Sequence, residues 1–146
     1  MGLVLGQENM KRYETFDHRA DIGIRGYGKS VEEAFENGAK AMFSVMVDIN
    51  DVKPVDKEDI DCEAPDLETL FVEWLNNLLS NAHLNGMLFC SFKVEINANK
   101  LRGSAWGERL EKHTNHLMTE VKAATYSMLK VVKEDDGYIA QCIVDV

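Results

Sequence analysis

The spacing of apolar residues changes along the chain from a period of two to a helical period and back. From Arg12 to Tyr27 apolar and polar residues alternate, which predicts two short strands. Between Val31 and about Asp48 the apolar residues recur at helical spacing. Ser30 stands just before this segment and Glu33 lies three residues further on, which is the pattern of a capping box at the start of a helix. A first helix is therefore expected here.

A second helix is predicted behind an acidic stretch. Residues 51–63 alternate and are interrupted by Pro54, which is typical of an edge strand. Pro65 and Asp66 then begin a run of apolar residues at helical spacing, and Gly86 supplies its end.

Beyond Gly86 the period returns to two almost throughout. We expect strands at residues 88–96, 101–110, 121–132 and 138–146, a turn at 97–100, a polar loop at 111–119 and a hairpin turn at 135–137. This order predicts an α+β fold, with a mostly antiparallel sheet and two amphipathic helices packed on one face.

Composition fits one domain in a reducing compartment. The chain has 146 residues, of which 45% are hydrophobic, enough for a core of its own. We expect residues 1–10 to be a flexible N-terminal tail and residues 11–146 to form a single domain. Cys62, Cys90 and Cys142 form no C-x-x-C pair, so neither a disulfide framework nor a zinc ribbon is indicated. Without a signal peptide or a membrane span, a cytoplasmic location is expected.

The net charge of -9 bears on the kind of partner. Acids concentrate between Asp48 and Glu73, whereas bases outnumber acids between Lys93 and Lys133. A negative field opposes phosphate backbones, because nucleic-acid affinity depends mainly on cationic contacts. Strong direct binding to nucleic acid is not expected, and a protein partner fits better.

One segment matches a phosphate-binding loop in form. Gly23 to Ser30 fits G-x-x-x-x-G-K-S and precedes a predicted helix, which suggests a nucleotide-binding enzyme. However, Ile22 and Ile24 alternate with polar or small residues as in a strand, and an extended segment cannot wrap around phosphate. A strand that leads into a capped helix is the favoured interpretation.

Two other candidate groups give weak signals. His113 and His116 could face one metal ion, but their polar neighbours favour a solvated loop. Ser104 lacks the glycine spacing of a nucleophile elbow. Neither group predicts an active site.

Acids at strand ends are more informative. Asp21 begins one predicted strand, and Asp145 ends another. If these strands are antiparallel neighbours, both carboxylates and the α-carboxylate of Val146 converge. Such a cluster repels itself unless it is paired or binds a cation, and oxygen ligands favour Ca²⁺ or Mg²⁺ over zinc. Solvated acids are the alternative interpretation.

Several short motifs in order resemble the archease family. They are His18-Arg19-Ala20-Asp21-Ile22-Gly23-Ile24, Gly28-Lys29-Ser30 followed by Glu32-Glu33-Ala34-Phe35, Trp74-Leu75 with Leu78-Leu79, Ala105-Trp106-Gly107-Glu108, Glu120-Val121-Lys122-Ala123-Ala124-Thr125-Tyr126, and Asp145-Val146. The resemblance extends from about Lys11 to the last residue.

The resemblance implies a function and a site. It implies a non-catalytic cofactor protein of the GTP-dependent, RtcB-type RNA ligase of tRNA splicing, which promotes guanylylation of the ligase's histidine and multiple turnover. Asp21, Asp145 and the terminal carboxylate of Val146 correspond to the family's metal site, with Ca²⁺ expected and Mg²⁺ as the alternative. Lys122 corresponds to the family's functional lysine.

Two residues depart from the family pattern. Arg19 stands where Thr is usual and places a cation beside Asp21, which is expected to compete with a metal ion for that carboxylate. Ser127 stands where a His is common. Two other function classes stay open: a stand-alone nucleotide-dependent enzyme that uses Gly23 to Ser30, and a general protein chaperone or binding module.

Overall fold

The computed structural model describes residues 12–146, so the predicted tail lies outside the described residues. The first alternating segment forms a hairpin of β1 (Tyr13–His18) and β2 (Asp21–Gly28). Its turn contains Arg19 at a positive φ of 58°. The two short strands expected from the alternation are confirmed.

Both predicted helices are present with the predicted caps. Helix α2 (Val31–Met46) begins at Ser30, whose hydroxyl accepts the Glu33 N–H at 3.1 Å. Helix α3 (Leu67–Asn85) begins at Asp66 and ends at Gly86, which adopts a left-handed φ of 60°. The residue types named from the sequence therefore do set the helix ends.

The remaining elements are short helices and strands. They are η1 (Ile49–Asp51), β3 (Asp56–Glu63), β4 (Met87–Asn97), β5 (Lys100–Arg109), η2 (Leu110–His116), β6 (Ala123–Ala124), β7 (Lys130–Glu134) and β8 (Gly137–Asp145). The turn between β4 and β5 and the hairpin between β7 and β8 lie where they were expected.

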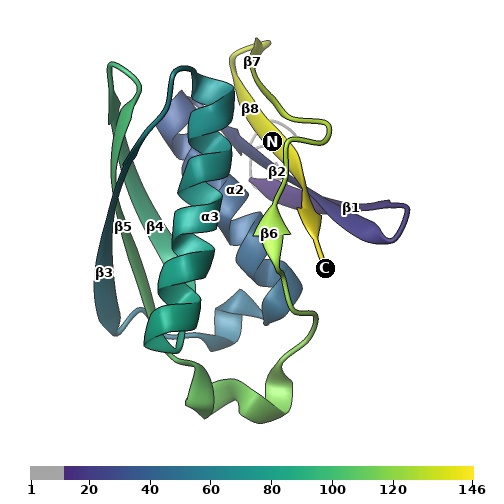
Figure 1. Cartoon of the computed structure of the whole chain (residues 1–146), viewed down its shortest axis with the longest axis vertical. Coiled ribbons are helices and arrows are strands. Elements are labelled where there is room, and N and C mark those ends of the chain that lie inside the picture. The colour runs from purple at the N-terminus through teal and green to yellow at the C-terminus, as the bar shows by residue number, and fades with distance from the viewer. Residues whose placement is uncertain (1–11) are drawn as a thin grey trace, which may run out of the picture.

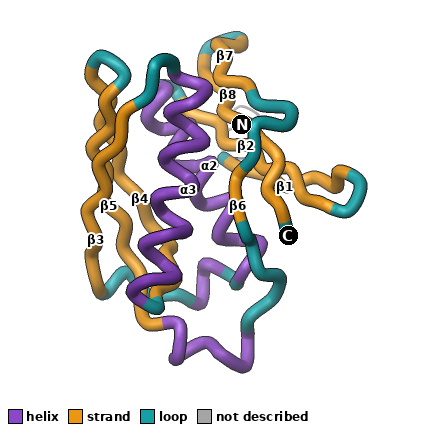
Figure 2. The backbone as a smooth tube through the Cα atoms, viewed as in Figure 1, coloured by secondary structure: helices purple, strands orange, loops and turns teal. Residues whose placement is uncertain are grey.

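The strands form two antiparallel sheets. A five-stranded sheet has the order β1-β2-β8-β6, with β7 also paired to β8, and a three-stranded sheet has the order β3-β5-β4. Strand β3 is an edge strand, as Pro54 indicated. The two helices lie between the sheets and pack on one face of each (Figure 1; Figure 2). The α+β class is confirmed, although the sheet is divided in two.

The core fills the space between the helices and both sheets. Trp74 is fully buried, lies against Gly103 of β5, and donates its indole N–H to the Phe35 carbonyl of α2 at 3.1 Å. Gly26 lets β2 approach α2 closely, because a Cβ there would collide with the backbone of Ala34 and Gly38. One continuous core therefore joins the two sheets.

The expected strand at 121–132 is wrong in extent. Only Ala123 and Ala124 pair as β6, and the chain then turns, with Met128 at a φ of 51°, before β7 begins at Lys130. Val121, Ala124 and Val131 are buried, whereas Tyr126, Ser127 and Met128 of the turn are exposed. The alternation of residue types in the sequence therefore did not correspond to one paired strand.

The polar loop expected at 111–119 is exposed apart from His113, so only the solvated placement of that residue is wrong. Its first part is the 3-10 helix η2, and His113 is only 6% exposed. The His113 Nε2 lies 2.6 Å from Glu108 Oε1, and the same carboxylate oxygen accepts the Lys53 N–H at 3.2 Å. His113 therefore joins η2 to β5 through a buried carboxylate.

The structure contradicts a phosphate-binding loop at Gly23 to Ser30. Most of this segment is strand β2, held between β1 and β8 along its length. Its glycines serve packing: Gly23 lies under the Phe16 ring, and Gly28 contacts the first turn of α2. Because the backbone is already paired on both sides, it cannot cradle phosphate.

The two long helices belong to the core, and no helix within residues 12–146 combines the length and apolarity needed to cross a bilayer.

Candidate metal-binding site

The pairing of β2 with β8 brings the two predicted acids to the same end of the five-stranded sheet. The antiparallel register places Ile22 opposite Val144. Asp21 precedes Ile22 and Asp145 follows Val144, so the two acids occupy the next opposed position. Opposed residues of antiparallel strands project from the same face. The register therefore brings the start of β2 and the end of β8 to the same end of the sheet, while convergence of the carboxylates on one ion stays a prediction.

A hydrogen bond joins Asp21 to the last residue. The Val146 N–H donates to Asp21 Oδ1 at 3.3 Å, across 125 positions of the sequence. Val146 and Asp21 are both half-buried, whereas Asp145 is exposed. The end of β8 therefore lies directly beside the start of β2 (Figure 1).

The predicted functional lysine lies beside the same pair of strands. The Lys122 N–H donates to the Asp145 carbonyl at 2.8 Å, immediately before β6. Ala123 is opposite Asp145 and Ala124 is opposite Val144. The side chain of Lys122 is exposed. All four residues named from the resemblance thus lie at one end of the sheet.

The donors at this end suit a hard cation only if the main chain contributes. Within residues 12–146, the side chains of His, Cys, Asp and Glu form no group of three able to hold a metal ion. Asp21 and Asp145 supply two carboxylates, so a third would be the α-carboxylate of Val146. Such an all-oxygen set fits Ca²⁺ or Mg²⁺, which bind carboxylates, backbone carbonyls and water.

Residues of the β1–β2 hairpin surround this end. His18 is opposite Asp21 in the β1–β2 register and is half-buried. Arg19 is exposed at the tip of the turn. Its expected competition with a metal ion for Asp21 stays a prediction.

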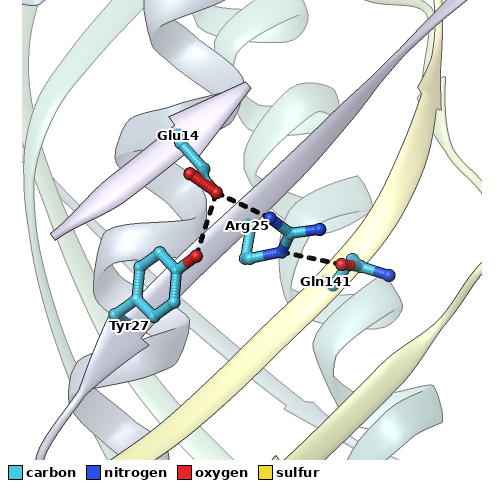
Figure 3. A network of polar contacts seen from close by, with 4 residues as sticks. All are labelled: Glu14, Arg25, Tyr27 and Gln141. Carbon is cyan, nitrogen blue, oxygen red and sulfur yellow. Dashed lines mark hydrogen bonds and ion pairs between the residues drawn. The ribbon is translucent and has the colours of Figure 1, made fainter. Parts of the chain in front are cut away.

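A polar network that the sequence did not suggest lies on the same face, farther from the chain end (Figure 3). Arg25 donates to Glu14 Oε1 at 2.6 Å and to Gln141 Oε1 at 2.8 Å, so it links β1, β2 and β8. Tyr27 donates its hydroxyl to the same Glu14 oxygen at 2.9 Å, and Gln141 donates to the Met128 carbonyl at 2.9 Å. The only sign of this network in the sequence was that Arg25 and Tyr27 alternate with Ile24 and Gly26.

The network keeps a charged guanidinium partly out of water. Burial disfavours the charge of Arg25, but hydrogen bonds to Tyr27 and Glu14 outweigh it and raise the Arg25 pKa above its ordinary value. The guanidinium also lies over the Phe16 ring, 4.7 Å from its centroid. The network therefore holds three strands in register next to the acidic end.

These features define a small α+β domain with two antiparallel sheets around a helix pair and a candidate cation site where its first hairpin meets the end of the chain. The archease protein family model matches residues 13–146, and the chain belongs to this family.

Curated relatives and solved structures agree with this assignment. The chain is 40% identical to protein archease of Sulfurisphaera tokodaii and 42% identical to that of Pyrococcus abyssi, each over 94% of this chain and 100% of the relative. The solution structure of Methanobacterium thermoautotrophicum protein 1598 has a TM-score of 0.82 at 37% identity, over 94% of this chain and 100% of that one.

A crystal structure from Thermotoga maritima, described as an archease and possible chaperone, has a TM-score of 0.62 over 90% of this chain and 94% of that one. Its 19% identity supports the shared fold alone.

Proposed function

We propose that this chain is a non-catalytic activator of an RtcB-type, GTP-dependent RNA ligase of tRNA splicing. In this role it promotes guanylylation of the ligase's histidine and multiple turnover, and the ligase carries out the joining reaction. Membership of the archease family supports the proposal. The observation that carries it is the gathering of Asp21, Asp145, Val146 and Lys122 at one sheet end.

Asp21, Asp145 and the α-carboxylate of Val146 would hold a divalent cation, Ca²⁺ or Mg²⁺. When bound, such a cation supplies positive charge at this end and leaves coordination positions for water or for a group from the ligase. The hydrogen bond from Val146 to Asp21 orients the last residue toward the same place.

Lys122 would act at the same end through its exposed ammonium group. Its backbone is fixed to Asp145, so its side chain starts next to the acidic pair. Docking of this end at the mouth of the ligase's active site would favour the ligase conformation that accepts GTP and its metal ions.

The direct test is reconstitution of the cognate ligase with GTP and Ca²⁺ or Mg²⁺, with and without this chain. The chain should stimulate guanylylation, and Asp21→Ala should lower that stimulation at least about tenfold. Asp17→Ala is the matched control, because Asp17 is an exposed acid of the same hairpin that lies opposite Ile22. It should retain stimulation within about twofold.

Two outcomes would separate the parts of the proposal. Full stimulation by Asp21→Ala would remove the role of the acidic end. No stimulation by the unmodified chain would remove the activator function itself.

Simple assays distinguish the competing function classes. A stand-alone enzyme would turn over GTP or ATP as the purified chain, and Lys29→Ala would abolish that turnover. A general chaperone would act on unrelated client proteins and would tolerate loss of Asp145 and Val146, because exposed apolar surface would then bind the client. An activator of one ligase predicts neither result.

A further inference from the structure

A side chain of α3 makes two backbone-like hydrogen bonds with β6. Asn76 Nδ2 donates to the Ala124 carbonyl at 3.1 Å, and the Ala124 N–H donates to Asn76 Oδ1 at 2.8 Å. A primary amide has the same donor and acceptor as a peptide group. Asn76 therefore pairs with Ala124 as a neighbouring strand would.

Strand β6 needs this pairing because it has only two residues. On one side, Lys122 and Thr125 donate their N–H groups to the carbonyls of Asp145 and Ile143, at 2.8 and 2.9 Å. Between them, Ala124 sits at a position where the N–H and C=O point away from β8. These groups are buried, with Ala124 only 6% exposed, so they require partners from elsewhere.

The geometry of α3 makes Asn76 the residue that reaches β6. The helix packs along β6 (Figure 1). Asn76 is half-buried on the flank of the helix, beside the fully buried Leu75. The next residue, Asn77, is also half-buried, but its amide donates within the helix to the Glu73 carbonyl at 2.7 Å. The amide of Asn76 therefore binds the backbone of β6, whereas the amide of its neighbour Asn77 binds only its own helix.

We propose that Asn76 is a positioning residue that fixes β6, and through it Lys122, at the Asp145 end of the five-stranded sheet. The inference rests on the proposed function, since it assumes that Lys122 engages the ligase. The Asn76 amide holds β6 on the side that faces α3, while β8 holds the other side. Lys122 lies one residue before β6, so the position of β6 determines the position of Lys122.

The first experiment measures amide hydrogen exchange by NMR at Lys122 and Thr125 in the full chain. Neither amide is bonded to Asn76, so both report on release of β6 and not on loss of a direct partner. Asn76→Ala should speed exchange at both at least about tenfold, and the control Asn77→Ala should stay within about twofold. Unchanged protection in Asn76→Ala would overturn the inference.

The second experiment is a double-mutant cycle in the ligase guanylylation assay. Asn76→Ala should lower stimulation about tenfold in the otherwise unmodified chain, but less than about twofold in a chain that already carries Lys122→Ala. A residue that only stabilised the fold would give independent losses in both backgrounds. Independent losses would therefore overturn the positioning role.

A milder variant guards against misfolding. Asn76→Gln keeps both the donor and the acceptor of the amide, on a side chain that is longer by one methylene. It should give smaller effects than Asn76→Ala in both experiments, and losses as large as those of Asn76→Ala would overturn the inference. If the unmodified chain fails to stimulate the ligase, the proposed function fails, while the exchange data still decide whether Asn76 fixes β6.

Discussion

The outer faces of the two sheets are both built from alternating polar residues, but the side chains on each face connect the strands differently. On the five-stranded sheet, Arg25 binds Glu14 and Gln141 and so connects three strands. On the three-stranded sheet, Lys57 pairs with Asp59 of the same strand at 3.5 Å, with side chains 52% and 74% exposed. Asp59 also accepts the Ser104 hydroxyl of β5 at 2.9 Å, an exposed contact that joins two strands only. The first face is a connected, half-buried network, and the second is a solvated surface.

The difference lies in what each strand has for neighbours. Gln141 in the middle of the five-stranded sheet bonds the chain on both sides, to Arg25 and to the Met128 carbonyl of the turn before β7. Strand β3, at an edge, has a paired strand on one side only. A polar pattern therefore becomes an organised site where long complementary side chains face each other across several strands, and stays a solvated face elsewhere.

The largest effect is expected where the two sheets share a core. Trp74 is fully buried, and Trp74→Ala should lower the free energy of unfolding by about 3–5 kcal/mol. Trp106→Ala is the matched control on the outer face, where Trp106 is half-buried beside Lys57, and it should lower that energy by less than half as much. Urea unfolding followed by circular dichroism measures both. Equal losses would mean that the outer face is as tightly packed as the core.

The next effect tests the two outer faces directly. Arg25→Ala should lower the free energy of unfolding by about 1–3 kcal/mol, because it leaves a partly buried Glu14 carboxylate without this partner. Lys57→Ala should change it by less than about 0.5 kcal/mol, as exposed ion pairs contribute little. The same urea titrations, in low and high salt, provide the measurement. A Lys57→Ala loss as large as that of Arg25→Ala would contradict the contrast between the faces.

Local signals in the sequence predicted much of this fold. Ser30, Asp66 and Gly86 mark helix ends because capping depends on a few neighbouring residues. The position of Asp21 and Asp145 at one end of the sheet was also predicted, since antiparallel pairing of two strands fixes which strand ends are neighbours. Their roles in metal binding and ligase activation stay predictions.

The features that were missed depend on contacts between distant segments. Periodicity does not tell which strands pair, so the division into two sheets was not visible. His113 looked solvated because its partner Glu108 lies on another element, and polar neighbours in sequence say nothing of that burial. Asn76 resembled Asn77 in every local respect, and only the position of β6 beside α3 separates their roles.

The buried pair of Glu108 and His113 should make stability depend on acid pH. The hydrogen bond from His113, together with that from the Lys53 N–H, holds the Glu108 pKa below its ordinary value of 4.5. Because the folded-state pKa is lowered, the stabilisation is present above about pH 4.5 and is lost as pH falls through the lower folded value.

The measurement is the difference in unfolding free energy between the unmodified chain and Glu108→Gln, by urea titration from about pH 6 to pH 3. The variant keeps a side chain of similar shape that does not titrate. The contributions of the other acids to the pH dependence therefore cancel when the two unfolding free energies are subtracted. The advantage of the unmodified chain should shrink as the pH falls below 4.5. A constant difference across this range would show that the pair does not stabilise the carboxylate.

The smallest effect is expected in the rate at which two thiols are alkylated. Burial raises the pKa of Cys142, on the inner side of β8, to about 12, and that of Cys62, on the edge strand β3, to about 11. Both thiols should therefore react slowly with iodoacetamide at neutral pH, since the thiolate is the nucleophile. Cys62 is half-buried and should be modified in the folded protein, whereas Cys142 should be modified only when the chain unfolds. Mass spectrometry of time courses with and without urea distinguishes the two, and equal rates at both thiols in the folded protein would place the inner side of β8 within reach of solvent.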